Sequence, residues 1–162
     1  MSESTSEHPT LTPEALEEIR AHAKREYPNE CCGIVFGPRA QPVADNVRPC
    51  VNIQNQLHAE DPATHTRDAR TAYNLGATDL FALGKSLRGD APAKIIYHSH
   101  VDTPGDGAYF SATDQAAAKM EDEPSYPVEY VVIEIKNERT GPAAQFAWDD
   151  ARKAYVEVRR YT

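Results

Sequence analysis

No apolar run in this sequence approaches the roughly 18 residues that a membrane-spanning helix needs. The first ten residues, Met1 to Thr10, have neither the basic start nor the apolar stretch of a secretory signal peptide. From these two absences we expect a cytoplasmic protein that does not insert into a membrane.

Cysteine is scarce. The three cysteines, Cys31, Cys32 and Cys50, fit no even-numbered disulfide framework, and no C-x-x-C spacing is present for a structural zinc or a thioredoxin-like pair. We therefore expect reduced, mostly buried thiols. A redox-sensitive role for Cys31 and Cys32 stays open, although neighbouring side chains on an extended chain point in opposite directions.

Positive charge is also in deficit, with 17 Lys and Arg against 25 Asp and Glu, which gives a net charge of −8. No local basic patch offsets it, and such a surface repels a phosphate backbone. We expect no nucleic-acid partner.

What remains is the composition of an ordinary globular protein: 162 residues, 40% hydrophobic and 26% charged. This length predicts one domain with one core. We expect a disordered polar leader over residues 1–10 and a single domain over residues 11–162. The oligomeric state leaves no legible signal in the sequence.

The order of predicted elements indicates an α+β or mixed α/β fold. Helices are predicted from Pro13 to about Arg25, with Thr12 as its cap, from Ala77 to Leu87, and from Ala112 to about Met120. Residues 54–66 show no periodicity and are predicted to form a loop. Strands are predicted over residues 33–37, 43–53, 69–74, 94–98, 128–135, 143–148 and 155–161.

One segment carries the pattern of a metal site. His98 and His100 lie at the end of a predicted strand, and residues i and i+2 point to the same side of a strand, so both imidazoles can face one point. Asp114 is the candidate third ligand, because hydrolytic zinc sites combine three protein ligands with one open position. Two alternatives stay open: paired histidines at a strand end are often hydrogen-bonded or exposed, and Ser111-x-x-Asp114 is also typical of a helix start.

Other metal-site patterns are absent. The sequence has no H-E-x-x-H and no deaminase pair of H-x-E with P-C-x-x-C. The run from His98 to Asp102 resembles the start of the metallo-β-lactamase pattern H-x-H-x-D-H, but Thr103 replaces its last histidine. A hydrolytic metal also needs a base, and Glu30, at the junction of the first helix and first strand, is the candidate. A glutamate beside a strand is, taken alone, usually a solvated surface residue.

Three separated matches in order, Pro28-x-Glu30-x-Cys32-Gly33, His98-Ser99-His100 and Ser111-x-x-Asp114, resemble the JAMM (MPN-plus) metallopeptidase family, in its compact bacterial form. The resemblance extends from about Leu11 to Tyr161. It implies a mixed β-sheet flanked by helices, the cytidine-deaminase-like JAMM (MPN) fold. It also implies one zinc ion held at His98, His100 and Asp114.

The resemblance further implies that Glu30 acts as general acid and base on the zinc water and that Ser111 hydrogen-bonds the developing oxyanion. The implied activity is hydrolysis of an amide bond after the C-terminal glycines of a ubiquitin-like or sulfur-carrier protein. Two departures leave substrate choice open. The loop 101–110 is longer than in many relatives, with a tip at Gly105 to Gly107 that we expect to be mobile, and Phe110 stands where proline is common.

Two other functions stay open at this stage. MPN domains that have lost their metal ligands serve as assembly modules, but this chain retains Glu30, both histidines and Asp114. The same residues could also hydrolyse a small-molecule amide or ester without a protein partner.

Overall fold

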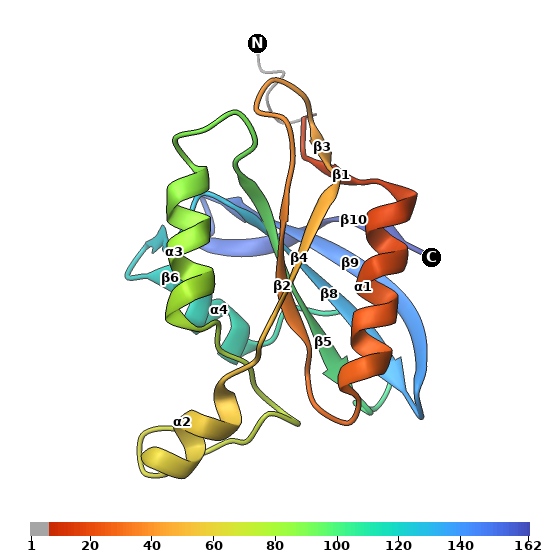
Figure 1. Cartoon of the computed structure of the whole chain (residues 1–162), viewed down its shortest axis with the longest axis vertical. Coiled ribbons are helices and arrows are strands. Elements are labelled where there is room, and N and C mark those ends of the chain that lie inside the picture. The colour runs from red at the N-terminus through yellow and green to blue at the C-terminus, as the bar shows by residue number, and fades with distance from the viewer. Residues whose placement is uncertain (1–6) are drawn as a thin grey trace.

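The computed structural model describes residues 7–162. Its centre is a six-stranded sheet in the order β10-β9-β8-β5-β2-β4. Figure 1 shows helix α1 on one face of this sheet and α3 and α4 on the other, with α2 at the end where β5 finishes. The sheet strands are β2 (Cys32–Phe36), β4 (Asn46–Cys50), β5 (Ala93–Val101), β8 (Glu129–Lys136), β9 (Arg139–Asp149) and β10 (Ala154–Tyr161). The helices are α1 (Pro13–Glu26), α2 (Gln54–Glu60), α3 (Ala77–Ser86) and α4 (Ala112–Ala118).

The sheet is mixed, because β5 pairs with β8 in parallel while the other neighbouring pairs are antiparallel. Two small sheets complete the fold: β1 (Thr10–Leu11) with β3 (Val43–Ala44), and β6 (Lys119–Met120) with β7 (Glu123–Pro124). A mixed sheet flanked by helices confirms the predicted α+β fold class.

Helix α1 begins where the sequence predicts. Thr12 is the cap, and its hydroxyl accepts a hydrogen bond from the Ala15 amide, while Pro13 occupies the first turn, where no amide partner is needed. Leu16 and Ile19 lie on its buried face. Each buried side chain of this size contributes roughly 1.5–3 kcal/mol, so α1 is held mainly by packing on the sheet.

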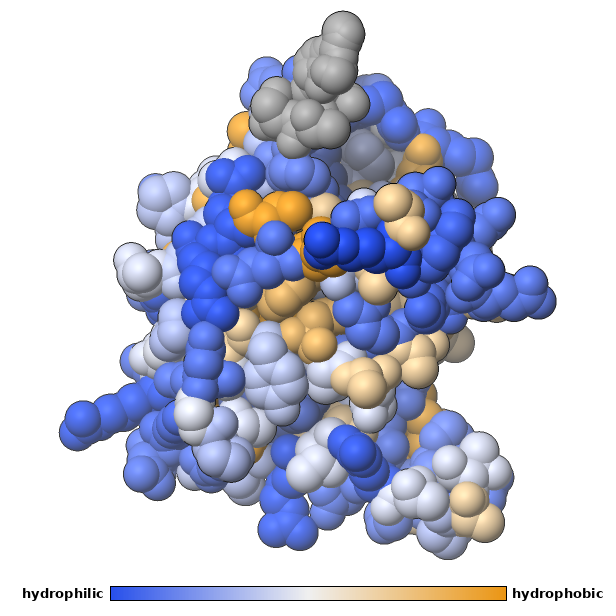
Figure 2. All heavy atoms as spheres, turned by 180° about the vertical axis from the view of Figure 1, so that it is seen from behind, coloured by the Kyte–Doolittle hydropathy of each residue, from blue (hydrophilic) through white to orange (hydrophobic). Residues whose placement is uncertain are grey.

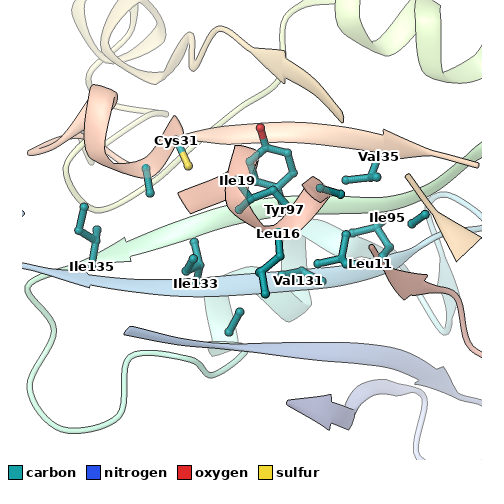
Figure 3. Close-up of a cluster of buried hydrophobic side chains, with 14 residues drawn as sticks. Leu11, Leu16, Ile19, Cys31, Val35, Ile95, Tyr97, Val131, Ile133 and Ile135 are labelled. Atoms are coloured by element: carbon teal, nitrogen blue, oxygen red, sulfur yellow. The ribbon is translucent and has the colours of Figure 1, made fainter. Parts of the chain in front are cut away.

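Strand alternation divides the core into two layers. On the α1 side, shown in Figure 3, Ile95 and Tyr97 of β5 pack with Val131 and Ile133 of β8 and with Ile19. The intervening residues of β5 point to the other face, where Ile96 packs with Ile34, Val132 and Leu83 in a second cluster. His98 and His100 continue the alternation of Ile96, and therefore face the side of the sheet that α3 and α4 cover.

Tyr97 explains why glycine is required at position 33. A Cβ on Gly33 would lie 2.3 Å from the Tyr97 ring, so the ring occupies the space of a side chain on β2. The Tyr97 hydroxyl lies 2.7 Å from Nδ1 of His22, which is buried in α1. Burial, with the charge of Arg25, lowers the pKa of His22 to about 4, so this buried ring stays neutral at physiological pH.

Several predicted elements were wrong. Residues 54–60 form α2 instead of a loop, and residues 69–74 contain no strand. The predicted strand 43–53 is divided into β3 and β4. Strand β5 extends to Val101, so His100 lies inside the strand instead of beyond its end. In α3 the side chain of Leu83 is buried, whereas that of Phe81 is 72% exposed.

The start of the described chain is attached to the sheet. Of the leader predicted to be disordered, residues 1–6 lie outside the described residues. The carbonyl of Pro9 accepts a hydrogen bond from the Gln145 side chain, and Thr10 pairs with Val43 in β1. Within residues 7–162, no helix is both long enough and apolar enough to cross a membrane. Figure 2 views the molecule from the side opposite to Figure 1. It shows a largely hydrophilic surface with hydrophobic residues gathered near the middle of the view.

Candidate metal centre

The first two candidate ligands are positioned by β5. His98 and His100 are 0% and 5% exposed, and their Nε2 atoms lie 3.3 Å apart. Such closeness follows from the period of the strand, which returns the side chain to the same face after two residues.

The third candidate ligand is positioned by the start of α4. Ser111 caps this helix, and its hydroxyl oxygen accepts a hydrogen bond of 3.0 Å from the Asp114 amide. In return, the Ser111 amide donates to Oδ2 of Asp114 at 3.0 Å. This capping box fixes the Asp114 carboxylate at the first turn. The two readings of Ser111-x-x-Asp114, helix start and metal ligand, are thus compatible in one geometry.

The three side chains meet at one point. Nε2 of His98 lies 3.2 Å from Oδ1 of Asp114, and Nε2 of His100 lies 3.2 Å from Oδ2. Donor atoms held about 2.0–2.1 Å from zinc at tetrahedral angles are about 3.4 Å apart. The histidine nitrogens are 3.3 Å apart and each lies 3.2 Å from one oxygen of Asp114, which is close to this spacing, so the three side chains could hold an ion such as zinc.

The hydrogen bonds around His100 favour a cation at the same point. Its Nδ1 lies 3.0 Å from the carbonyl oxygen of Gly107, a contact that requires a proton on Nδ1. In the neutral ring, Nε2 then presents a lone pair toward the oxygens of Asp114. A cation between these atoms removes the repulsion. Nδ1 of His98 is buried without a hydrogen-bond partner in the described part of the chain, and the His98 ring stacks on Tyr73 with centroids 4.4 Å apart.

Glu30 lies on the same face of the sheet. In the register of β2 and β5, Cys32 is opposite His98, and Ser99 donates its amide to the carbonyl of Cys31 at 3.2 Å. Glu30 precedes Cys32 by two residues, so the alternation of an extended chain places its side chain on the same face as Cys32. Glu30 is 5% exposed and lines the cleft that contains His100, Ser111 and Asp114.

Burial controls the charge of both carboxyl groups. Burial, together with the charge of Asp114, raises the pKa of Glu30 to about 9, against the opposing charge of Arg67. Burial acts in the same upward direction on Asp114, but the positive charge and hydrogen bonds that His98 and His100 supply when protonated outweigh it and hold the pKa of Asp114 well below its usual range. Asp114 is therefore an anionic donor at neutral pH, while Glu30 retains a proton that it can transfer.

Asn52 fixes the backbone of Glu30. Its side-chain amide donates to the carbonyl of Glu30 at 2.9 Å and to that of Ala72 at 3.1 Å. The Glu30 amide in turn donates to the carbonyl of Ala69 at 2.7 Å. The segment 66–74 is thereby tied to the residue before β2, a connection between distant parts of the chain that no sequence pattern indicates.

The cleft has a volume of about 410 Å³. Sequence reasoning missed three of its side chains: Arg67, Arg70 and Tyr109. The two arginines come from a segment predicted to be loop and strand, and Tyr109, 43% exposed, comes from the loop before α4. No local sequence pattern indicates that these three side chains line the cleft.

The loop 101–110 is tied to the sheet. Oε1 of Glu134 accepts from the Gly107 amide at 2.9 Å, and Nη2 of Arg160 lies 2.7 Å from Oδ2 of Asp106 and donates to the carbonyl of Ala108 at 3.1 Å. The loop tip that we expected to be mobile thus has fixed contacts on two strands, β8 and β10. Its role in the site is to place the Gly107 carbonyl against His100.

A larger cleft, of about 610 Å³, opens where β5 and β8 begin. Lys94, Glu129 and Trp148 are among its lining residues, and none of the candidate ligands is. The smaller cleft, and not the larger one, is therefore the one lined by candidate ligands.

The three cysteines are free and buried. Burial raises the pKa of the Cys31 thiol to about 12 and that of Cys50 to about 12. Cys31 and Cys32 belong to the cores on opposite faces of the sheet, as the alternation of an extended chain requires. Protonated thiols are poor nucleophiles and poor metal ligands, so the described geometry favours a structural role for them.

A mixed sheet between helices, with a histidine pair inside a central strand and a Ser-x-x-Asp helix start beside it, is the arrangement of an MPN-like domain. A family model described as prokaryotic homologs of the JAB domain (Prok-JAB) matches residues 12–150. The chain therefore belongs to the prokaryotic JAB-domain family.

Relatives and solved structures agree with this assignment. Proteins named CysO-cysteine peptidase from Mycobacterium tuberculosis and Mycobacterium bovis are 30% identical over 118 residues, which cover 72% of this chain and 66%, just under two thirds, of the relative. A solution structure from Desulfitobacterium hafniense is similar with a TM-score of 0.62 at 22% identity, covering 91% of this chain and 88% of the other. One from Salinibacter ruber has a TM-score of 0.59 at 23% identity, covering 93% and 88%. At these identities the two structures establish the fold.

Proposed function

We propose that the protein is a zinc-dependent metallopeptidase that hydrolyses the amide bond after the C-terminal glycines of a ubiquitin-like or sulfur-carrier protein. The observation that carries the proposal is the cluster of His98, His100 and Asp114 beside a cleft whose lining includes His100, Asp114, the buried Glu30 and Ser111. The name of the mycobacterial relatives, CysO-cysteine peptidase, supports the sulfur-carrier side of the proposal.

In this proposal His98, His100 and Asp114 hold one zinc ion per chain. When bound, zinc supplies Lewis-acid chemistry: it polarises an amide carbonyl and lowers the pKa of a water molecule. The donor set fits this ion, because two imidazole nitrogens and one carboxylate oxygen leave a fourth tetrahedral position open.

Glu30 is the proton carrier of the proposed reaction. In its ionised form this carboxyl accepts a proton from the attacking water, and in its protonated form it delivers that proton to the leaving amine. Burial raises the pKa of this carboxyl to about 9 in the metal-free protein, which makes the ionised form a stronger base for the first transfer. The backbone bonds from Asn52 and Ala69 hold the residue in place while its side chain exchanges the proton.

Ser111 is positioned to stabilise the oxyanion. Its hydroxyl oxygen accepts from the Asp114 amide at 3.0 Å, so its own proton is free to donate into the cleft. A hydrogen bond aimed at developing negative charge typically contributes 10²–10³ in rate, roughly, when it is preorganised by the fold. The capping box provides this preorganisation.

The substitution Glu30→Gln tests the proposal. It removes the proton carrier but none of the metal donors, so we expect zinc binding to remain at about one equivalent while hydrolysis falls by about 10²–10⁴. The measurement is turnover of a sulfur-carrier protein extended beyond its terminal Gly-Gly, with metal content determined on the same samples. As a matched control, Glu18→Gln changes an exposed carboxyl on α1 and should leave both values at the wild-type level. Full turnover by Glu30→Gln would assign the proton transfer to another group.

A further inference from the structure

Arg67 lies on the wall of the cleft, beside Glu30 and Ser111. The neighbouring Arg70 also lines the cleft, but its guanidinium is paired with Asp68, Nη2 to Oδ2, at 3.2 Å. Within residues 7–162 the guanidinium of Arg67 makes one hydrogen bond, a long one of 3.4 Å to the carbonyl of Thr71, and no salt bridge. Arg67 therefore presents a cation with several open donors to the cleft.

The backbone of Arg67 is held in position relative to Glu30. Its carbonyl accepts from the side-chain amide of Gln54, which is 4% exposed, at 2.8 Å. Two residues later, the Ala69 amide donates to Asn55 at 2.8 Å, and the Ala69 carbonyl accepts from the Glu30 amide at 2.7 Å. The first turn of α2 thus ties the loop that carries Arg67 to the residue that carries the proton.

The charge of Arg67 influences the pKa of Glu30. Burial and the charge of Asp114 raise its pKa, while the charge of Arg67 acts in the opposite direction, so the guanidinium is near enough to influence the carboxyl. The remaining ionisable groups on the cleft wall are the acids Glu30 and Asp114, His100, the paired Arg70 and the phenols of Tyr73 and Tyr109. An anionic group of a substrate could therefore form an ion pair with Arg67, whose guanidinium has open donors.

Glu30 also defines the side of the cleft on which the leaving group lies. In the proposed function its carboxyl gives a proton to the amine nitrogen that departs. If that nitrogen belongs to a free amino acid, one Cα atom separates it from the α-carboxyl carbon, and the carboxylate oxygens lie within about 3.6 Å of the nitrogen. The carboxylate must then lie in the surroundings of Glu30, where Arg67 is.

We propose that Arg67 binds the free α-carboxylate of a single amino acid joined through its amine to the terminal glycine of the carrier. The inference rests on the proposed function and makes it narrower: the enzyme removes one terminal residue and discriminates against isopeptide bonds. In the reaction the amide C–N bond breaks, the hydroxyl of water joins the glycine carbonyl carbon, and the proton passes through Glu30 to the amine. The products are the carrier carboxylate and the free amino acid.

The chemistry of arginine suits this role. Its planar guanidinium matches a carboxylate with two parallel hydrogen bonds, which a lysine ammonium cannot reproduce. The ε-amine of a lysine in an isopeptide has no carboxylate beside the scissile nitrogen, so Arg67 would gain no partner there. Specificity then comes from the difference between the two leaving groups.

The test compares two substrates that differ in one group. A sulfur-carrier protein ending in Gly-Gly is joined to cysteine as the free acid or to cysteinamide, and both are supplied to the zinc-loaded enzyme. We expect kcat/KM to favour the acid by about tenfold or more, and Arg67→Ala to reduce this preference to about one by raising KM more than it lowers kcat. Arg67→Lys should restore part of the preference. Arg88→Ala, which removes an equal charge from an exposed position outside the cleft lining, should behave as wild type.

Equal cleavage of acid and amide by the wild type overturns the role of Arg67 and leaves the proposed function intact. If neither is cleaved, the proposed function fails, and a binding measurement then tests the role of Arg67. Calorimetry on the zinc-loaded Glu30→Gln protein measures the affinity for the same two conjugates. A preference for the acid that Arg67→Ala abolishes supports the carboxylate site, and equal affinity, or no binding, contradicts it.

Discussion

At the residue scale, the proposed chemistry depends on the different charges of two carboxyl groups in one cleft. Asp114 is stabilised as an anion by the adjacent histidines and its capping bonds, while burial keeps the pKa of Glu30 at about 9. In the proposed function, these surroundings give two similar groups different roles: Asp114 donates electrons to a cation and Glu30 carries a proton.

The raised pKa of Glu30 predicts a pH-dependent loss of stability. Between about pH 4.5, the ordinary value, and about pH 9, the unfolded chain ionises Glu30 while the folded protein keeps it protonated. The unfolded state then binds fewer protons, so the free energy of unfolding falls as pH rises through this window. In the metal-free protein, Glu30→Gln should therefore gain stability relative to wild type between pH 4 and pH 8, on the order of 2–5 kcal/mol.

Denaturant unfolding of both metal-free proteins at the two pH values measures this difference. Glu18→Gln, on the exposed face of α1, serves as the control for loss of a negative charge. A Glu30→Gln gain that is the same at pH 4 and pH 8 would show that the carboxyl ionises normally in the folded protein.

At the element scale, the start of α4 combines two functions in one turn. Ser111 caps the helix with its hydroxyl and lines the cleft. The Asp114 carboxylate accepts a hydrogen bond from the Ser111 amide and also lies beside His98 and His100. Ser111→Ala removes both the cap and the hydroxyl, whereas Ser111→Gly retains much of the capping energy, since glycine is tolerated at this position.

These two variants separate stability from catalysis. Ser111→Ala should lower the free energy of unfolding by about 1 kcal/mol, and Ser111→Gly by a few tenths. Both should lower kcat by about 10²–10³, because the oxyanion donor is lost in each. Thermal unfolding and turnover measured on the same samples check the pair. Wild-type turnover by Ser111→Gly would mean that the hydroxyl acts only as a cap.

The helices and strands also show how much of the fold could be predicted from the sequence. Helices α1 and α3 and the strands of the last third were predicted within a few residues, because periodicity, caps and turn residues are local signals. Helix α2 was missed, since its short run from Gln54 has no capping side chain and one buried residue, Gln54. Its stability comes from long-range bonds, such as the one from Gln54 to the Arg67 carbonyl, which are not visible in a local window.

At the scale of the whole molecule, the sheet register brings the site together. Glu30, the histidine pair and the Ser111–Asp114 turn are far apart in the sequence, and antiparallel pairing of β2 with β5 places the first two on one face of the sheet. Residue patterns indicated the histidines, Asp114 and Glu30 as candidates, and the resemblance to a known family added the role of Ser111. The structure places Glu30, His100, Ser111 and Asp114 on the wall of one cleft. The arginines of that cleft depended on tertiary contacts, and no local pattern could indicate them.

The most direct measurement of the central hypothesis is titration of zinc into the metal-free protein by calorimetry. The account predicts one equivalent bound per chain, with His100→Ala and Asp114→Ala each weakening the affinity at least about a hundredfold, because each removes one of three donors. His58→Ala, which changes a histidine outside the cleft, should bind like wild type. Absence of binding, or the same affinity after loss of His100 or Asp114, would contradict the metal centre on which the proposed chemistry depends.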